Sequence, residues 1–275
     1  MTCLLSVTDL CKSFADQAVV HSVSFDVDES TTLGIVGESG SGKTTLVRSI
    51  LRAIDPDSGT VRYKSRDGWQ NLHELTAKNL LPLRREIQMV FQDPFASLNP
   101  RMTVQAILEE PLIIHRMGDN AWRKNCVADI LQRVQLDASD ATRFPHAFSG
   151  GQRQRIAIAR ALILEPRLVV CDESVSALDM SVQAQILDLL NTLQSDLGLT
   201  YLFVAHDLRV VREFCDHVLV MHAGRVVELG PVDEVFNSPK HDYTRLLLSA
   251  IPSHDPDEKL NPLDRSSLNL GAELD

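Results

Sequence analysis

The segment GIVGESGSGKTTLVRSIL (34–51) places four glycines, a lysine and two threonines between an apolar run and a helical pattern. Residues 37–44 fit GxxxxGK[ST], in which missing Cβ atoms let successive backbone N–H groups point at one phosphate chain. The following helix adds the positive partial charge of its N terminus. We predict a nucleoside triphosphate site in which Lys43 reaches the β- and γ-phosphates and Thr44 binds Mg²⁺. The predicted phosphate-binding residues are Gly37, Glu38, Ser39, Gly40, Ser41, Gly42, Lys43, Thr44 and Thr45.

A pair of carboxylates follows a second apolar run, LVVCDE (168–173). The run predicts a buried strand, and Asp172 at its tip can hold Mg²⁺ through the water shell of the ion. Glu173 can then accept a proton from an attacking water as a general base. The alternative is that the two carboxylates only cap the next helix.

The segment FSGGQRQRIAIARAL (148–162) begins with Ser149 and two glycines and continues as a helical pattern. A helix that opens in this way presents a hydroxyl and free N–H groups to an anion. Taken alone, the pattern is equally well explained as a capped helix. Its position between the phosphate loop and the acidic pair favours a part in nucleotide binding.

Alternating strand and helix patterns surround these segments and must position them. Short apolar runs such as TTLGIV (31–36) and TYLFVAH (200–206) predict buried strands, and helical patterns follow them. The stretch 57–85 is polar and turn-rich, and the proline-containing stretch 93–104 predicts an irregular connection. The pattern HVLVMHAGRVVELG (217–230) predicts a hairpin that turns near Ala223 and Gly224. We expect an α/β fold with a mainly parallel sheet and an antiparallel β part near the N-terminal side.

The same patterns divide the chain into three parts. We expect residues 1–92 and 158–235 to form a nucleotide-binding α/β core. Residues 93–157 are expected to form an inserted helical subdomain, which includes the SGGQ motif (149–152) and the first part of its helix. Residues 236–275 are expected to hold a short helix and a polar tail.

Composition limits the function classes. The net charge of −10 argues against nucleic-acid binding, which depends on phosphate neutralisation by lysine and arginine. Five cysteines without a CxxC pair predict reduced, structural thiols rather than disulfides or a metal cluster. No apolar run approaches the roughly 18 residues of a membrane span, and Asp9 and Lys12 are too early for a signal-peptide core, so we expect a soluble, cytosolic chain.

The order of the motifs, phosphate loop, then SGGQ, then the acidic pair, resembles the ATP-binding cassette (ABC) family over nearly the whole chain. The resemblance implies a RecA-like P-loop NTPase fold of the ABC type that binds ATP and Mg²⁺. It implies that Gln92 senses Mg²⁺ and the attacking water, that His206 contacts the γ-phosphate, and that Phe14 stacks on adenine. It also implies that the SGGQ helix completes a site on the opposite subunit, with Asp179 at the dimer contact. The residues assigned in this way to a partner's ATP are Ser149, Gly150, Gly151 and Gln152.

Within the family, the segments VFQDPFASLNPRMTV, SALDMSVQAQILDLL and HDYTRLLLSAIP look like the ATPase subunits of bacterial peptide, opine and nickel uptake systems. This likeness implies two membrane-spanning permease subunits, a second ABC ATPase subunit (a heterodimer rather than a homodimer) and an extracytoplasmic solute-binding protein. It places the chain on the cytoplasmic face of the bacterial inner membrane. The loop 93–104 resembles the groove that receives coupling helices of the membrane subunits. Three departures are Ser174 in place of proline, Phe148 in place of leucine, and a tail without a cysteine cluster.

Two other classes remain open. One is an ABC-like ATPase of a soluble enzyme assembly, of the carbon–phosphorus lyase type, whose sequences resemble those of the peptide transporters. The long loop after Gln92 favours a transporter. DNA-repair ATPases carry large inserts between the motifs, and nothing of that size lies between Thr44 and Asp172. The transported substrate cannot be read from these residues.

Overall fold

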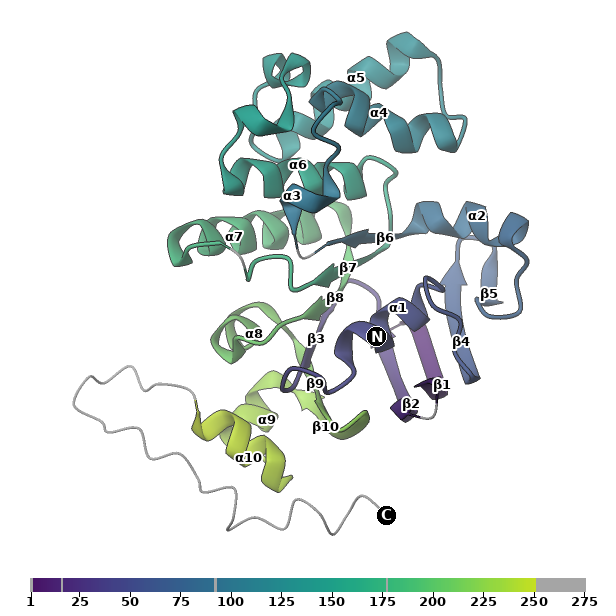
Figure 1. The fold of residues 1–275 in the computed structure, drawn as a ribbon, viewed down its shortest axis with the longest axis vertical. Helices are drawn as coiled ribbons and strands as arrows, with labels where there is room; N and C mark the ends of the chain where they lie inside the picture. The colour runs from purple at the N-terminus through teal and green to yellow at the C-terminus, as the bar shows by residue number, and fades with distance from the viewer. Residues whose placement is uncertain (1, 16, 92, 177, 251–275) are drawn as a thin grey trace, which may run out of the picture.

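A six-stranded sheet forms the centre of the computed structural model, which describes residues 2–15, 17–91, 93–176 and 178–250. The strand order is β10-β9-β3-β8-β7-β6 (Figure 1). The bounds are β3 (Thr32–Val36), β6 (Ile87–Val90), β7 (Leu168–Asp172), β8 (Thr200–Val204), β9 (His217–His222) and β10 (Arg225–Pro231). The pairs β6·β7, β7·β8, β8·β3 and β3·β9 are parallel, whereas β10 is antiparallel to β9. The predicted mainly parallel sheet and the predicted hairpin are both confirmed.

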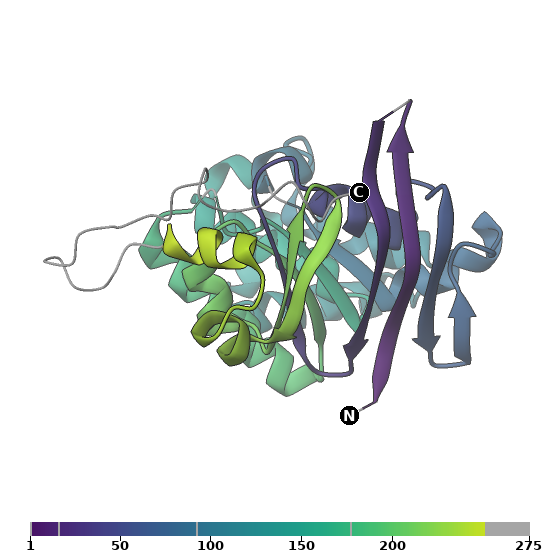
Figure 2. The same ribbon diagram turned by 90° about the horizontal axis from the view of Figure 1, so that it is seen from below.

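A second, antiparallel sheet of order β2-β1-β4-β5 stands beside the first (Figure 2). Its strands are β1 (Cys3–Phe14), β2 (Gln17–Asp28), β4 (Ser58–Ser65) and β5 (Gly68–Asn71). Strand β2 alternates buried and less buried residues over most of its length, as a strand with one covered face does, whereas register shifts interrupt the alternation in β1. This sheet confirms the predicted antiparallel β part.

The central strands are buried on both faces because their side chains alternate between two hydrophobic cores. One core lies between the two sheets and includes helix α1 (Lys43–Ile50). The other lies under the helices of the opposite face. Central-strand residues of the first core include Leu33, Ile35, Val170, Leu202 and Val204, and those of the second include Val169, Cys171, Tyr201 and Phe203.

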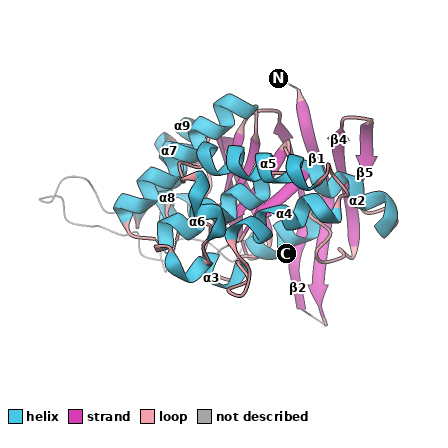
Figure 3. Cartoon of the chain, turned by 90° about the horizontal axis from the view of Figure 1, so that it is seen from above, coloured by secondary structure: helices cyan, strands magenta, loops and turns pink. Residues whose placement is uncertain are grey.

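The helical region packs on the second of these faces, together with α7 (Met180–Leu197) and α8 (Leu208–Phe214) (Figure 3). It consists of α3 (Pro94–Ser97), α4 (Val104–Ile114), α5 (Asn120–Arg133), the short 3₁₀ helices η1 (Ala138–Thr142) and η2 (Pro145–Ala147), and α6 (Gly150–Leu162). Helix α6 contacts α4, α5 and α7, so it joins the helical region to the face of the sheet. The predicted boundary at 157/158 falls inside α6 and stays a prediction.

Two short helices, α9 (Val232–Asn237) and α10 (Asp242–Ser249), follow the β9–β10 hairpin, whose turn residues Ala223 and Gly224 both have positive φ. The Asp207 side chain caps α8 by accepting a hydrogen bond from the Arg209 N–H. None of the helices in the described ranges combines the length and the apolarity that a membrane span requires.

The stretch 57–85, which the sequence marks only as polar and turn-rich, forms regular elements. It contains β4, β5 and the helix α2 (Ala77–Glu86). Strand β4 forms because it pairs with β1, some fifty residues earlier in the chain, and a proline inside α2 obscures the helical pattern. The stretch 93–104 also contains a helix, the single turn α3.

Candidate nucleotide site

The predicted phosphate loop joins the end of β3 to the start of α1. Gly37, Gly40 and Gly42 have φ values of 151°, 84° and 100°, which side chains rarely adopt. A Cβ on Gly37 would lie 2.2 Å from the Met221 carbonyl oxygen, and one on Gly42 would lie 2.6 Å from that of Val19. Helix α1 begins without a side-chain cap, so its first N–H groups remain to be satisfied by an anion. The loop therefore fits a bound phosphate chain.

A cavity of about 170 Å³ lies over this loop. It is lined by Val19, Ser39, Gly40, Gly42, Lys43, Thr44, Thr45 and Glu173. The other three predicted loop residues do not line this cavity, and each contacts another part of the chain. Gly37 packs against Met221, Ser41 accepts the N–H of Gly224 through its carbonyl, and Glu38 donates its N–H to the Tyr243 hydroxyl.

Lys43 lies at the base of the cavity and is almost fully buried. Its ammonium donates hydrogen bonds to the carbonyls of Gly37 and Glu38, each at 2.9 Å. Burial lowers the pKa of Lys43, while the carboxylates of Glu173 and Asp172 act in the opposite direction. A buried ammonium in contact with a glycine-rich loop is well placed to meet a phosphate oxygen.

Asp172 ends β7 and lies opposite the first turn of α1. The Thr44 hydroxyl donates to the Asp172 carboxylate, with 3.4 Å between the oxygens. Burial raises the pKa of Asp172, whereas Arg48 acts to lower it. A hydroxyl and a carboxylate are the hard oxygen ligands that Mg²⁺ takes together with water and phosphate. The pair therefore fits the predicted Mg²⁺ role, even though the described residues contain no cluster of three or more His, Cys, Asp or Glu for a metal.

Glu173 turns away from the strand direction directly after Asp172. Its φ of 48° is in the left-handed region, and its N–H still donates to the Val204 carbonyl of β8 at 3.0 Å. The His206 Nδ1 lies 3.8 Å from a Glu173 carboxylate oxygen. Glu173 lines both the loop cavity and a second cavity of about 140 Å³ that includes His206 and Asp207. A carboxylate between the two cavities is placed where a general base could meet an attacking water.

The cysteine before this acidic pair, Cys171, is fully buried. Burial raises the pKa of its thiol to about 12. The thiol is therefore protonated at neutral pH and serves packing.

The SGGQ motif forms the N terminus of α6. The Ser149 hydroxyl accepts the Gln152 N–H at 3.3 Å, and the Gln152 side chain accepts the Ser149 N–H at 3.0 Å. This reciprocal capping box satisfies two helix donors. The described residues that line the loop cavity include Glu173 but none of Ser149, Gly150, Gly151 and Gln152. The structure thus does not bring the SGGQ residues to the chain's own phosphate loop.

The remaining predicted residues differ in how far the structure describes them. Asp179 is exposed and caps α7 by accepting the Val182 N–H at 3.0 Å. Phe14 is 48% exposed beside the Lys12 ammonium and does not line the cavity, although Val19, further along the same hairpin, does. Gln92 lies outside the described residues. Val19 and Tyr243 were not predicted, because no sequence motif links either residue to the phosphate loop.

The two departures inside the described chain are both buried side chains. Ser174 is 2% exposed and Phe148 is 3% exposed. Phe148 belongs to the core under the helices, and the Arg143 guanidinium lies 4.4 Å from its ring. Because both side chains are buried, the two departures affect packing.

The chain matches profiles and sequences of known transport proteins. Residues 20–176 match the profile of the ABC transporter family, and residues 227–272 match that of the oligopeptide/dipeptide transporter C-terminal region. The chain is similar to OppF, an oligopeptide transport ATP-binding protein of Bacillus subtilis, with 49% identity over 88% of the chain and 79% of OppF. It is similar to a protein of Brucella ovis named for peptide import, with 48% identity over 94% of the chain and 81% of that protein. GsiA, named for glutathione import in Pectobacterium atrosepticum, is 47% identical over 87% of the chain and 38% of GsiA.

Solved structures agree. CbiO1 of Clostridium perfringens, part of the ABC transporter complex cbiONQ, superposes with a TM-score of 0.77 at 27% identity, over 86% of the chain and 92% of CbiO1. The dimeric cassette MJ0796 bound to ADP and Pi gives a TM-score of 0.72 at 28% identity, over 83% of the chain and 99% of MJ0796. The predicted fold class is therefore confirmed. The chain belongs to the ABC transporter family, as an ATP-binding and ATP-hydrolysing cassette that uses Mg²⁺.

Proposed function

We propose that the chain powers the uptake of peptides, or of a related small solute, as the ATPase subunit of an importer with separate membrane subunits. The observation that carries the proposal is the cavity that the phosphate loop shares with Glu173, beside the Thr44–Asp172 pair. The match of residues 227–272 to the oligopeptide/dipeptide transporter region supports the peptide class. The alternative of a soluble enzyme assembly gains no support from these matches.

In the proposed mechanism the chain's own residues divide the work on ATP. The loop N–H groups and the Lys43 ammonium bind the phosphates and offset their charge. Thr44 and Asp172 would hold Mg²⁺, which supplies charge stabilisation when bound. Glu173 takes a proton from water, and His206, whose Nδ1 lies 3.8 Å from a Glu173 carboxylate oxygen, orients that carboxylate. His206 is also the proposed contact for the γ-phosphate. Gln92, which lies outside the described residues, stays the predicted sensor of Mg²⁺ and the attacking water.

Dimerisation of cassettes and membrane permease partners are features of this family. We propose that the SGGQ motif completes the ATP site of a second cassette. Support comes from the exposure of Ser149 and from its absence from the cavity over the chain's own loop. On the resemblance to subgroup systems, that second cassette is a different chain, and a solute-binding protein delivers the cargo.

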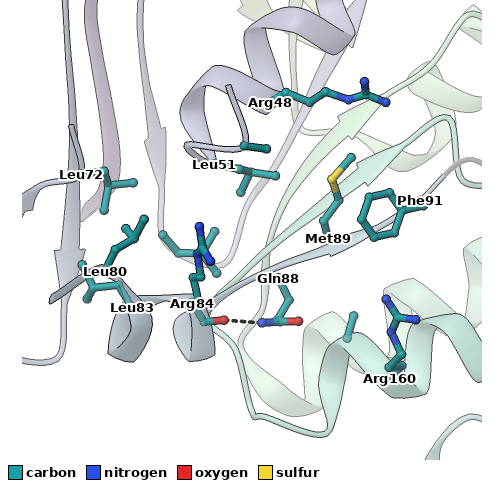
Figure 4. Close-up of a pocket in the computed structure, with 13 residues that line it drawn as sticks. Arg48, Leu51, Leu72, Leu80, Leu83, Arg84, Gln88, Met89, Phe91 and Arg160 are labelled. Atoms are coloured by element: carbon teal, nitrogen blue, oxygen red, sulfur yellow. Dashed lines mark hydrogen bonds between the residues drawn. The ribbon is translucent and has the colours of Figure 1, made fainter. Parts of the chain in front are cut away.

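The site for the membrane subunits is proposed at a groove of about 300 Å³ beside β6 (Figure 4). Its wall combines apolar groups such as Leu51 and Met89 with the cations Arg48, Arg84 and Arg160. Arg160 also donates to the Ser97 carbonyl at 2.6 Å, which ties the groove to the loop 93–104. A short amphipathic segment with acidic groups suits such a wall, and a coupling helix on the cytoplasmic side of the inner membrane is the proposed occupant.

Affinity purification tests the proposal. A tagged Glu173→Gln chain is isolated from detergent-solubilised cells in Mg-ATP, and its partners are identified by mass spectrometry. We expect two multi-span proteins and a second cassette ATPase. A soluble enzyme complex without membrane proteins would overturn the transport function and leave the ATP chemistry standing.

A further inference from the structure

The C-terminal helix α10 reaches the phosphate loop through one side chain. Tyr243 is fully buried, and its hydroxyl accepts a hydrogen bond from the Glu38 backbone N–H at 3.0 Å. The two residues are 205 positions apart in the chain. The hydrogen bond is partly shielded from water, and through it Tyr243 gives a fixed partner to the backbone at the second residue of the loop.

This contact fixes one peptide group from both ends. The Gly37 carbonyl, on the same peptide group as the Glu38 N–H, accepts from the Lys43 ammonium at 2.9 Å. The C=O and N–H of a trans peptide point in opposite directions. Lys43 and Tyr243 therefore hold the Gly37–Glu38 peptide between them and set the plane from which the rest of the loop continues.

The tyrosine is itself held in place by rigid elements. Its ring packs against the ring of His222, the last residue of β9, with 4.0 Å between ring centroids and an angle of 31° between the ring planes. The Glu228 carboxylate of β10 accepts the N–H groups of Lys240 and His241 at 2.9 and 3.1 Å. His241 then caps α10 by accepting the Tyr243 N–H. The hydroxyl position is thus determined by the β9–β10 hairpin and the start of α10.

We propose that Tyr243 is a positioning residue that couples helix α10 to ATP binding by pre-organising the phosphate loop. The proposal rests on the proposed role of residues 37–45 as the phosphate-binding loop. A loop that is already in its binding conformation loses less entropy when ATP binds. Because such coupling is reciprocal, bound ATP should in turn stabilise the docking of α10.

The first measurement is the affinity of the full-length chain for Mg-ATP. Tyr243→Phe removes the acceptor and keeps the ring, and we expect binding to weaken about three- to tenfold. Tyr201→Phe is the matched control, because Tyr201 is equally buried and its hydroxyl donates to a backbone carbonyl, that of Leu190, away from the loop. The control should lose thermal stability to a similar degree and bind Mg-ATP like the wild type.

The second measurement separates positioning from a general loss of stability. Hydrogen exchange of residues 242–249 is followed with and without Mg-ATP. In the wild type and in Tyr201→Phe we expect ATP to slow exchange in α10, and in Tyr243→Phe we expect this effect to disappear.

Wild-type affinity in Tyr243→Phe, or an α10 that responds to ATP as before, would overturn the proposal. Lys43→Ala distinguishes this failure from a failure of the proposed loop. If Lys43→Ala loses ATP binding while Tyr243→Phe keeps it, only the coupling is wrong. If both bind ATP normally, residues 37–45 are not the phosphate site.

Discussion

Two adjacent carboxylates receive different surroundings from the backbone, and this separates their roles. Asp172 still belongs to the strand and lies buried against Thr44. Glu173 takes a left-handed φ and turns its carboxylate toward His206. Strain of this kind is typical of functional positions, where the surrounding structure enforces it. Asp172 and Glu173, although adjacent and chemically alike, can therefore serve a metal ion and an attacking water, respectively.

Glu173→Gln should lower ATP turnover by about 10²–10⁴ if Glu173 is the general base, because glutamine cannot accept the proton. ATP should still bind, since the amide removes no phosphate contact. Steady-state hydrolysis and equilibrium binding measure the two effects. Glu213→Gln, an exposed carboxylate on α8, serves as the control and should leave both unchanged. Near-normal hydrolysis in Glu173→Gln would remove Glu173 from this role.

Asp172→Asn should stabilise the fold while it impairs hydrolysis. Burial raises the pKa of Asp172 in the folded chain, so folding stability falls as pH rises from the unfolded-state pKa through the folded one. At pH 7 the carboxyl of the unfolded chain is ionised, so burial of Asp172 opposes folding, and asparagine removes this cost. Thermal unfolding in EDTA at pH 7 should show a midpoint higher by about 2 °C. The gain should shrink as pH is lowered to about 4, where the aspartate of the unfolded chain is protonated. A lower midpoint at pH 7 would contradict the argument.

Motif chemistry made the site residues predictable, because each motif carries a local signature of glycine, hydroxyl or carboxylate spacing. The structure places six of the nine predicted loop residues around one cavity with Glu173. Val19 and Tyr243 could not be predicted, because their contacts with the loop come from strand and helix packing over long sequence separations. Phe14 was selected by resemblance, and its stacking on adenine stays a prediction.

At the scale of elements, the contact between α6 and α7 depends on one small residue. A Cβ on Gly151 would lie 2.5 Å from the Val182 Cγ1 atom of α7, whereas one on Gly150 would meet nothing closer than Leu178 at 3.7 Å. Helix α6 can approach α7 in this way only because Gly151 lacks a side chain.

Gly151→Ala should therefore lower the thermal midpoint, although alanine is the better helix former. Gly150→Ala adds the same methyl group on the same turn, and its midpoint should be equal to or higher than that of the wild type. A second substitution, Val182→Ala, should restore the stability of Gly151→Ala by opening the space. Equal midpoints for the two single variants would show that α6 is not constrained at Gly151.

Elements went unpredicted where the local sequence is a poor guide. Strand β4 exists because β1 offers a pairing edge, and Pro82 inside α2 interrupts the helical pattern. The buried parallel strands were predictable because a strand covered on both faces must be apolar throughout. The strand order of the sheet could not be predicted, since it depends on crossovers that leave no trace in local spacing.

At the scale of the whole molecule, the proposed functions occupy separate surfaces. The cavity over the phosphate loop, the exposed SGGQ terminus of α6 and the groove beside β6 are lined by different residues. Substitutions in the groove, apart from Arg48, which also acts on Asp172, should therefore affect partners without affecting nucleotide binding.

Arg84→Glu reverses a charge on the exposed wall of the groove and should abolish co-purification of membrane subunits while ATP affinity stays normal. Lys78→Glu makes the same change on the same helix at an exposed position that does not line the groove, so it should retain the membrane subunits. Immunoblotting of detergent extracts measures retention. Equal retention in the two variants would mean that the membrane subunits bind elsewhere.

The alkylation rate of the buried Cys171 thiol can report how often strand β7, which carries Asp172, opens. Only a thiolate reacts quickly with alkylating reagents, and a pKa of about 12 together with complete burial keeps Cys171 unreactive while β7 is in place. The alkylation rate at this position, read by peptide mass spectrometry, therefore reports how often the strand that carries Asp172 separates from its neighbours. Mg-ATP should lower the alkylation rate of Cys171, because a ligand that binds the closed sheet lowers the population of the opened sheet.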